Sequence, residues 1–262
     1  MKINVVGDST YCYTNSRDLD PDKESLVFVH GSGMDHTVWT MFCRHFARHG
    51  RNVIAVDLPG HGRSAGVPKQ SIEEMSDWIV ALLDALHIEQ AAIIGHSLGS
   101  LVALDCAARH SSRVRAIALV GTTAPMPVSD AILDAAAADD PAAFNMLTEY
   151  GYSKRHLYGG NSNPGMWMVA STLRLFERSR PGVLHADMNA CNNYQQGLER
   201  AARITCPVLV VMGEGDRLTP LRSAKELLAA LSSPKLRVLP GAGHTLMTEA
   251  PNELLDALKE AL

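Results

Sequence analysis

Residues 91–99 read AAIIGHSLG, an apolar run that leads into the pattern Gly-x-Ser-x-Gly. The residues that follow repeat apolar side chains at helical spacing, at Leu101, Val102 and Leu104. A sharp turn between a strand and a helix pushes a serine hydroxyl outward, and small residues two positions before and after it allow close approach of the neighbouring backbone. The stretch therefore predicts a nucleophile elbow with Ser97 at its tip.

A serine hydroxyl is a weak nucleophile at neutral pH, so the elbow predicts a histidine base and an orienting carboxylate, each after a later strand. The apolar run Cys206–Met212 leads into GEGDRLTP, which places Asp216 beyond the carboxyl end of a strand. The run Leu236–Leu239 leads into PGAGHTL, a loop with glycines before its histidine, His244. We predict a catalytic triad of Ser97 as nucleophile, His244 as base and Asp216 as acid.

Other titratable residues compete for these roles. Glu214 is the alternative acid, but it leaves the strand too early for the turn to bring it round to the histidine. Asp57 also follows an apolar run, yet it precedes the elbow in the chain and lies beside a proline and a glycine, which favours a structural role in a tight turn. His96 is expected to support the elbow, because adjacent residues on a strand face opposite ways. His30 and His61 lie in loops and are interpreted as structural.

A glycine-rich loop follows the first buried run of the chain and reads FVHGSG over residues 28–33. Its backbone amides are expected at the same edge of the sheet as the elbow. We predict that the N–H groups of Leu98 and Ser32 form an oxyanion hole, with Gly33 as the fallback donor. The Ser32 hydroxyl either assists this hole or is only small enough to fit.

Short β-rich runs alternate with helical patterns along most of the chain, which predicts a parallel sheet covered by helices on both faces. The runs are Leu26–His30, Val53–Asp57, Ala91–Gly95, Ala116–Gly121, Cys206–Met212 and Leu236–Leu239. The clearest helix spans residues 71–88, where Ser71 and Glu74 are placed to form a capping box. Further helices are expected after Thr219-Pro220 and from Pro251 to the end.

Residues 122–200 interrupt the alternation and indicate several helices without a convincing strand. We predict a core of residues 1–121 and 201–262 and a helical insertion of residues 122–200. The insertion is rich in methionine and aromatic residues, which suits an adaptable apolar pocket but equally suits packing of the insertion itself. The residues predicted to bind substrate are Gly31, Gly33, Met34, Met126, Trp167 and Met247.

The composition is that of an ordinary globular protein, with 262 residues, 46% hydrophobic and 20% charged. A formal net charge of −4 without a basic stripe argues against nucleic acid as a partner. Polar residues interrupt the most apolar stretch, 91–108, so no membrane helix is expected. The first residues lack the apolar core of a signal peptide, and we expect a cytoplasmic protein, a monomer or a homodimer, with a small-molecule partner.

Cysteine and motif content bear on cofactors. Five cysteines without a CxxC pair suggest neither a disulfide framework nor a zinc site. Metal and nucleotide motifs such as HExxH, the EF-hand and Walker A are missing from the sequence, so we expect no cofactor and no metal.

Five motifs stand in a fixed order: the HGSG loop, the DLPGHGRS turn, the GHSLGS elbow, the GEGD acid loop and the GAGH histidine loop. Together they resemble the α/β-hydrolase superfamily, in particular short-chain bacterial members with a helical lid, over nearly the whole chain. The resemblance implies an α/β fold with a mostly parallel eight-stranded sheet flanked by helices, and a lid inserted after the sixth strand, at residues 122–200. Ser97 stands where dehalogenases and epoxide hydrolases carry aspartate, which argues against those reactions. GHSLG also differs from the GNSMGG-like elbow of carbon–carbon bond hydrolases and the GGSWG-like elbow of proline iminopeptidases.

The expected activity is that of a cofactor-free serine hydrolase of the carboxylesterase type. It would cleave ester bonds of small, largely apolar substrates through an acyl-enzyme. A lactonase, a carbon–carbon bond hydrolase or a perhydrolase would use the same residues, since the fold supports many reactions. A ligand receptor that retains the triad and turns over slowly is the alternative from a different functional class.

Overall fold

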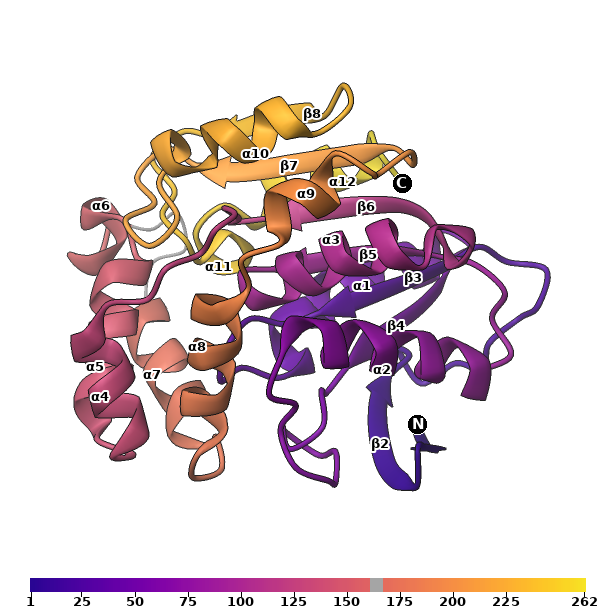
Figure 1. Cartoon of the computed structure of the whole chain (residues 1–262), viewed down its shortest axis with the longest axis horizontal. Helices are drawn as coiled ribbons and strands as arrows, with labels where there is room; N and C mark the ends of the chain where they lie inside the picture. The colour runs from indigo at the N-terminus through magenta and orange to yellow at the C-terminus, as the bar shows by residue number, and fades with distance from the viewer. Residues whose placement is uncertain (161–166) are drawn as a thin grey trace.

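A computed structural model describes residues 1–160 and 167–262 of the chain (Figure 1). An eight-stranded sheet forms its centre, in the order β1-β2-β4-β3-β5-β6-β7-β8. The first two strands pair antiparallel with each other, β2 pairs antiparallel with β4, and the remaining neighbours are parallel. The strands are β1 (Lys2–Val5), β2 (Asp8–Tyr13), β3 (Ser25–Val29), β4 (Asn52–Val56), β5 (Ala91–His96), β6 (Val114–Val120), β7 (Val208–Gly213) and β8 (Lys235–Leu239). The predicted mostly parallel sheet is confirmed.

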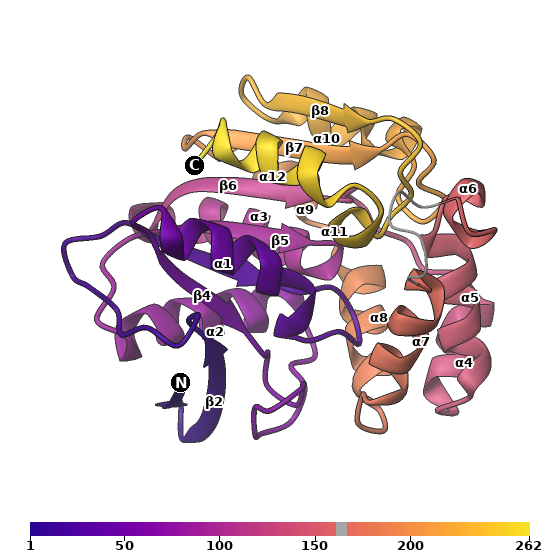
Figure 2. The same cartoon turned by 180° about the vertical axis from the view of Figure 1, so that it is seen from behind.

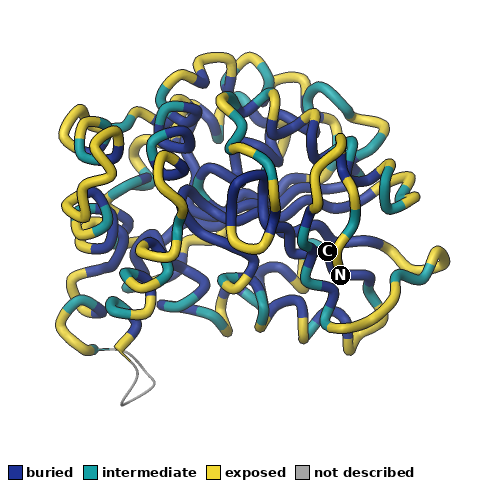
Figure 3. The backbone as a smooth tube through the Cα atoms, turned by 90° about the horizontal axis from the view of Figure 1, so that it is seen from below, coloured by how far each residue is buried: buried dark blue, intermediate teal, exposed yellow. Residues whose placement is uncertain are grey.

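The central strands are apolar on both sides because helices cover both faces of the sheet. Every residue of β3, β4 and β5 is buried. One face carries α2 (Ile72–Ala85), α3 (Leu98–Arg109), α9 (Gly197–Ala201) and α10 (Lys225–Ala230), which lie in front of the sheet in Figure 1. The other face carries α1 (Thr40–Arg48), α11 (Leu246–Glu249) and α12 (Pro251–Lys259), seen in front in Figure 2. Figure 3 shows the buried residues concentrated in the strands at the centre.

Local signals account for where several helices begin. The Ser71 hydroxyl accepts the N–H of Glu74 at 3.1 Å and caps α2. The second half of the predicted capping box differs, because the Glu74 carboxylate accepts the N–H of Gln70 instead of that of Ser71. Pro251 occupies the first turn of α12, as predicted. The helix expected after Thr219-Pro220 starts as a short 3-10 helix, η3 (Leu221–Ala224), before α10; two other 3-10 helices are η1 (His36–Trp39) and η2 (Ser111–Arg113).

The described residues between β6 and β7 form helices and no strand. The first five are α4 (Asp130–Ala137), α5 (Pro141–Gly151), α6 (Lys154–Leu157), α7 (Met168–Glu177) and α8 (Val183–Asn193). In Figures 1 and 2 these helices gather beyond the carboxyl ends of the parallel strands. Helices α4, α5, α7 and α8 share a small apolar cluster, to which Met34 from the loop after β3 also contributes. The sixth helix of the segment, α9, returns the chain to the sheet and packs against α3 and α10.

None of the helices in residues 1–160 and 167–262 has the length and apolarity that crossing a membrane requires.

Candidate active site

Ser97 lies at the turn between β5 and α3, in the strained backbone conformation that an elbow requires. Its φ is 52° and its ψ is −118°, a region that residues with a side chain seldom occupy. A Cβ atom on Gly95 would lie 1.9 Å from the carbonyl oxygen of Gly99. A Cβ on Gly99 would lie 2.4 Å from the carbonyl oxygen of Val29. Both glycines of the Gly-x-Ser-x-Gly pattern are therefore required by close backbone contacts, and the serine is left at the N-terminus of α3.

His244 and Asp216 come together from the loops after β8 and β7. Nδ1 of His244 lies 2.8 Å from Oδ2 of Asp216. The N–H groups of Leu218 and Thr219 donate to Oδ1 at 2.9 and 2.8 Å, and the Thr219 hydroxyl donates to Oδ2 at 2.7 Å. Because Nδ1–H donates to the carboxylate, Nε2 is left as the nitrogen that accepts a proton.

The environment keeps Asp216 ionised. Burial alone would raise its pKa, but the His244 charge and hydrogen bond, together with the donors from Thr219, lower the pKa from its usual 3.8 to about 2. A carboxylate that stays charged across neutral pH holds the imidazole in one tautomer and stabilises its protonated form.

Glu214 lies outside this arrangement. Its side chain is exposed, and its Oε2 accepts the N–H of Gly241 at 2.9 Å. It therefore links the two loops that follow β7 and β8 instead of contacting His244. The partner that the structure gives to His244 is Asp216.

Ser97 and His244 open onto the same cavity, of about 360 Å³, between the strand ends and the helices that follow β6. Its wall is mostly apolar, and Arg217 contributes the one cationic guanidinium among its described lining residues. A second, inner cavity of about 30 Å³ also includes Ser32, Ser97 and His244. The larger cavity is lined by Ser32, Ser97, Met126, Pro127, Val128, Ser129, Ile132, Leu147, Tyr150, Met188, Cys191, Arg217, Leu218, Thr219 and His244.

The loop of residues 31–33 passes directly against the elbow. A Cβ on Gly31 would lie 3.3 Å from the Cβ of Ser97. Among the hydrogen bonds of the described residues, neither the N–H of Ser32 nor that of Leu98 has a protein acceptor, so both donors are free. The N–H of Gly33, in contrast, donates to Oδ2 of Asp187 at 2.7 Å. The prediction of Gly33 as fallback donor is wrong, because a buried carboxylate already occupies that N–H.

Three of the six predicted substrate-binding residues line the cavities at Ser97, and the other three lie elsewhere. Met126 lines the larger cavity, and Gly31 and Met34 line the inner one. Gly33 lies outside both, on a separate pocket beside η1.

Trp167 and Met247 are also away from the site, which corrects their prediction. Trp167 precedes α7 and is 73% exposed, whereas the buried face of this helix is formed by Met168, Thr172 and Phe176. Because successive helical residues are rotated by about 100°, Trp167 points away from the face that packs inward. Met247, on α11, is buried in the apolar core to which α12 also contributes, and it lines a different cavity.

His96 supports the histidine loop, in agreement with its expected structural role. Its Nε2–H donates to the backbone carbonyl of His244 at 3.0 Å. Burial, followed by the charge of His244, lowers the pKa of His96 to about 3, so its ring is neutral. A neutral ring beside the triad does not compete for the proton that His244 carries.

Two buried carboxylates at the site were missed from sequence. Glu249 on α11 accepts the N–H groups of Gly243 and Thr245, at 2.9 and 3.2 Å, and so holds both sides of His244. Asp187 on α8 accepts the N–H of Gly33. The signal that identifies such residues is a charged side chain on the apolar face of a helix, although this pattern does not name the partner.

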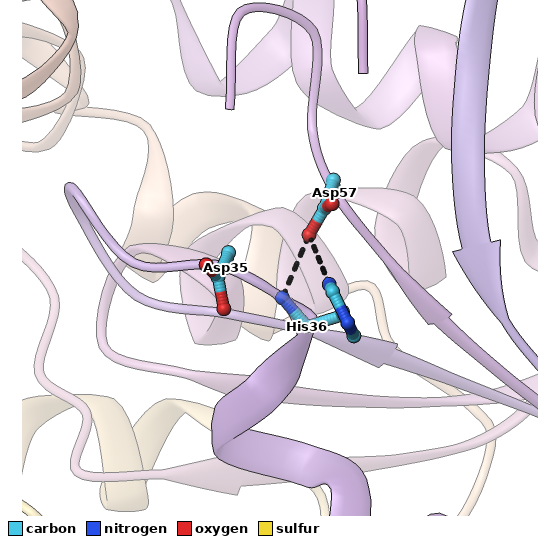
Figure 4. A group of neighbouring side chains, drawn as sticks. All are labelled: Asp35, His36 and Asp57. Atoms are coloured by element: carbon cyan, nitrogen blue, oxygen red, sulfur yellow. Dashed lines mark hydrogen bonds and ion pairs between the residues drawn. The ribbon is translucent and has the colours of Figure 1, made fainter. Parts of the chain in front are cut away.

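One cluster of metal-ligating residue types is present in the described part of the chain, at Asp35, His36 and Asp57 (Figure 4). Oδ1 of Asp57 accepts both the backbone N–H and the Nδ1–H of His36 at 2.8 Å, and its Oδ2 accepts the N–H of Arg63. Oδ2 of Asp35 accepts from Arg178 at 2.8 Å. These atoms are engaged in tying loops together, which fits the structural role expected for Asp57.

Comparison with known proteins places this geometry in a family. A model of the Alpha/beta hydrolase family matches residues 26–257. A pimeloyl-[acyl-carrier protein] methyl ester esterase from Aromatoleum aromaticum is 30% identical over 254 residues, which cover 88% of this chain and 95% of that protein. A 2-hydroxy-6-oxononadienedioate/2-hydroxy-6-oxononatrienedioate hydrolase from Burkholderia vietnamiensis is 28% identical over 260 residues, which cover 92% of this chain and 88% of that one.

The fold is shared with solved structures over its whole length. Est816, described as an N-acyl homoserine lactone degrading enzyme, matches with a TM-score of 0.84 over 100% of both chains, at 25% identity. The family match extends from β3 to α12 and includes every strand end that contributes to the site. The chain therefore belongs to the alpha/beta hydrolase family, and it is a hydrolase.

Proposed function

We propose that the protein is a serine hydrolase that cleaves carboxylic ester bonds of small, largely apolar substrates through an acyl-enzyme. The observation that carries the proposal is the hydrogen-bonded chain from Thr219 through Asp216 to His244, which shares one cavity with Ser97. Such a chain prepares a histidine to accept a proton from a serine at the same cavity wall.

The first half of the reaction forms the acyl-enzyme. Nε2 of His244 takes the hydroxyl proton of Ser97 as Oγ attacks the ester carbonyl carbon. The carbonyl oxygen becomes an oxyanion, which the free N–H groups of Ser32 and Leu98 bind, with the positive end of the α3 dipole behind it. The intermediate collapses, the bond to the alcohol oxygen breaks, and that oxygen takes the proton from His244.

The second half releases the acid. His244 deprotonates a water molecule, whose oxygen attacks the acyl carbonyl, and the same two N–H groups bind the second oxyanion. Collapse of this intermediate breaks the bond to Ser97 Oγ, and His244 returns the proton to the serine.

The substrate class follows from the cavity. A volume of about 360 Å³ with a largely apolar lining suits a modest acyl or alkyl group. We assign residues 122–200 the role of a lid, because Met126, Ile132, Leu147 and Met188 from this segment supply much of the apolar wall. The methyl ester esterase relative supports an ester as the bond cleaved.

The other reactions have some support of their own. A lactonase agrees with the likeness to Est816, and a carbon–carbon bond hydrolase agrees with the Burkholderia relative. A perhydrolase would use the same triad. The remaining alternative is a ligand receptor that retains the triad and hydrolyses its ligand slowly. Rapid turnover of a simple ester would argue against it.

Hydrolysis of p-nitrophenyl esters from acetate to decanoate tests the proposal. The expected result is turnover with an optimum at short to medium chain length, and a loss in kcat of about 10⁴-fold or more in Ser97→Ala with an unchanged melting temperature. Retained activity in the purified variant would reject Ser97 as nucleophile. If the wild type hydrolyses no ester in the series, ester cleavage is rejected, and a lactone and a vinylogous 1,5-diketone would be tested next.

A further inference from the structure

His61 and Asp187 are in contact beside the loop of residues 31–33, although 126 positions separate them in the chain. Their side chains are 2% and 0% exposed. Nε2 of His61 lies 2.9 Å from Oδ2 of Asp187, and the N–H of Gly33 donates to the same oxygen at 2.7 Å. The contact therefore joins three segments: the turn after β4, helix α8 and the loop after β3.

The hydrogen bonds of His61 define its protonation. Nδ1 lies 3.0 Å from the carbonyl oxygen of Pro59, and Nε2 faces the Asp187 carboxylate. Both partners are acceptors, so both ring nitrogens carry hydrogen and the ring is cationic. Burial would lower the pKa of His61, but the charge and hydrogen bond of Asp187 raise it above its usual value. The contact is thus a buried ion pair.

The neighbouring histidine has the opposite character. Nε2 of His30 accepts the N–H of Leu58 at 3.2 Å, which leaves Nδ1–H to donate to the carbonyl of Gly31 at 2.9 Å. Burial, together with the charge of His61, lowers the pKa of His30 to about 4, so this ring is neutral. His61 is therefore the cation that faces Asp187 in this part of the core.

The burial of Asp187 lowers the stability of the fold, and packing alone does not explain why a carboxylate lies there. Its Oδ1 is buried and has no hydrogen-bond partner among the described residues. An ion pair buried in this way is seldom more stable than apolar side chains of similar volume, and leaving one oxygen unsatisfied adds to the cost. Features that break a local rule at such a cost are expected at functional sites.

The backbone of the loop shows what the pair holds in place. Gly33 has a φ of +65°, and a Cβ there would lie 3.1 Å from Leu184 and 3.2 Å from Phe176, on α8 and α7. A Cβ on Gly31 would lie 2.8 Å from Nδ1 of His96 in the elbow. The loop is thus confined between the elbow on one side and the helices on the other, with Ser32 in the middle.

We propose that the His61–Asp187 ion pair is a positioning device for the oxyanion hole. Asp187, held by His61, accepts the N–H of Gly33 and fixes the Ser32–Gly33 peptide. It thereby holds the loop in the conformation in which the N–H of Ser32, in the preceding peptide, has no protein acceptor among the described residues and is available to the oxyanion. The pair also makes the position of α8, and so of the cavity wall, part of the same arrangement. This inference rests on the proposed function, because it assigns Ser32 to the oxyanion.

Variants of Asp187 separate the charge from the hydrogen bond. Asp187→Leu removes both, whereas Asp187→Asn retains an amide oxygen that can accept from Gly33 and is the milder change if the leucine variant folds poorly. Asp105→Asn is the matched control, because Asp105 is equally buried but accepts from Arg109 on α3 and from Tyr194 after α8, and has no hydrogen bond to the loop of residues 31–33. Each variant is characterised by kcat and KM for a p-nitrophenyl ester and by its melting temperature.

Transition-state binding provides a readout that a merely structural role would not move. A trifluoromethyl ketone forms a hemiketal oxyanion on Ser97, whereas the methyl ketone of the same shape remains unreacted. We expect Asp187→Leu to lower kcat and trifluoromethyl ketone affinity about 100-fold, the worth of one oxyanion donor, with KM and methyl ketone affinity within about threefold. For Asp187→Asn we expect kcat and trifluoromethyl ketone affinity between those of Asp187→Leu and the wild type. Asp105→Asn is expected to change neither kcat nor trifluoromethyl ketone affinity.

Two outcomes would overturn the inference. One is an equal loss of affinity for both ketones in Asp187→Leu, which would indicate a general disturbance of the cavity. The other is a loss of kcat in Asp105→Asn as large as that in Asp187→Leu, which would indicate that lowered stability is the cause.

Amide hydrogen exchange separates failure of this inference from failure of the proposed function, because it needs no substrate. We expect exchange at Gly33 to be at least tenfold faster in Asp187→Leu than in the wild type and unchanged in Asp105→Asn. Unchanged exchange at Gly33 would refute the tether itself. Absence of ester hydrolysis in the wild type, with faster exchange in the variant, would reject the proposed reaction and with it the role of the tether in that reaction.

Discussion

Glu249→Gln is expected to destabilise the protein and to slow the reaction, although the change is isosteric. Oε2 of Glu249 receives three donors, the N–H groups of Gly243 and Ser153 and Nδ1 of His156, at 2.8 to 3.0 Å. Oε1 receives the N–H of Thr245 at 3.2 Å. The side chain is fully buried, and the N–H groups of Gly243 and Ser153 depend on the carboxylate, whereas the N–H of Thr245 also donates to the carbonyl oxygen of Gly151 at 3.2 Å.

The magnitude follows from the donor count. An amide has one oxygen, which can serve the three donors at Oε2, but its NH₂ group then faces the N–H of Thr245. That N–H keeps only its second acceptor, the carbonyl oxygen of Gly151 at 3.2 Å, and the lost hydrogen bond costs about 1 kcal/mol. The three remaining hydrogen bonds lose their charge assistance, which is worth about 1 kcal/mol each. Roughly 4 kcal/mol of the free energy of unfolding is lost, which lowers the melting temperature by about 8–16 °C.

The same change reaches the chemistry, because Glu249 holds the residues on either side of His244. A loosened imidazole is expected to lower kcat about 10- to 100-fold, since errors of about 1 Å in the position of a reacting group cost this much. Thermal and urea unfolding and the steady-state kinetics of ester hydrolysis measure the two effects. Glu89→Gln, an exposed site far from the loop, is the control and should shift stability by less than about 0.5 kcal/mol. A melting temperature within 2 °C of the wild type (about 0.5–1 kcal/mol) together with an unchanged kcat would refute the reasoning.

Three further predictions concern the acid, the pH dependence and the cavity. Asp216→Asn should lower kcat by about 10⁴-fold in ester hydrolysis while Glu214→Gln leaves it within about twofold, and the reverse order would make Glu214 the acid. Because the folded pKa of Asp216 is about 2 against 3.8 in the unfolded chain, its ionisation contributes about 2 kcal/mol, which is fully present above about pH 4 and lost as the pH falls through 2. Urea unfolding between pH 2 and 7 should show this fall in the free energy of unfolding of the wild type at low pH. An equal dependence on pH in Asp216→Asn would contradict the prediction. Trp167→Ala should leave kcat/KM for a hexanoate ester unchanged while Met126→Ala alters it, as measured across the ester series; equal losses would place Trp167 at the substrate.

Much of the fold and of the triad is encoded in short-range patterns. The apolar run before Ser97 and the glycines around it specify a strand, a strained turn and a helix within nine residues, and close backbone contacts at Gly95 and Gly99 make the pattern obligatory. Asp216 and His244 are found in a similar way, because each lies in a glycine-containing loop after a strand. The strand before Asp216, β7, is buried, whereas β8 before His244 is exposed except at Leu239. Parallel strands end at one edge of the sheet, so three local signals suffice to bring these residues together.

What the sequence alone determined, then, is the succession of the six strands β3 to β8 along the chain and the identity of the residues that their ends present. Only the tertiary structure decided which buried carboxylate meets which donor, as Asp187 with Gly33 and Glu249 with Gly243, and which face of α7 turns Trp167 to solvent. The physical reason is the distance along the chain between the residues that interact. Turn geometry depends on neighbouring residues, whereas the partner of a buried charge and the rotation of a helix depend on packing between segments far apart in the chain.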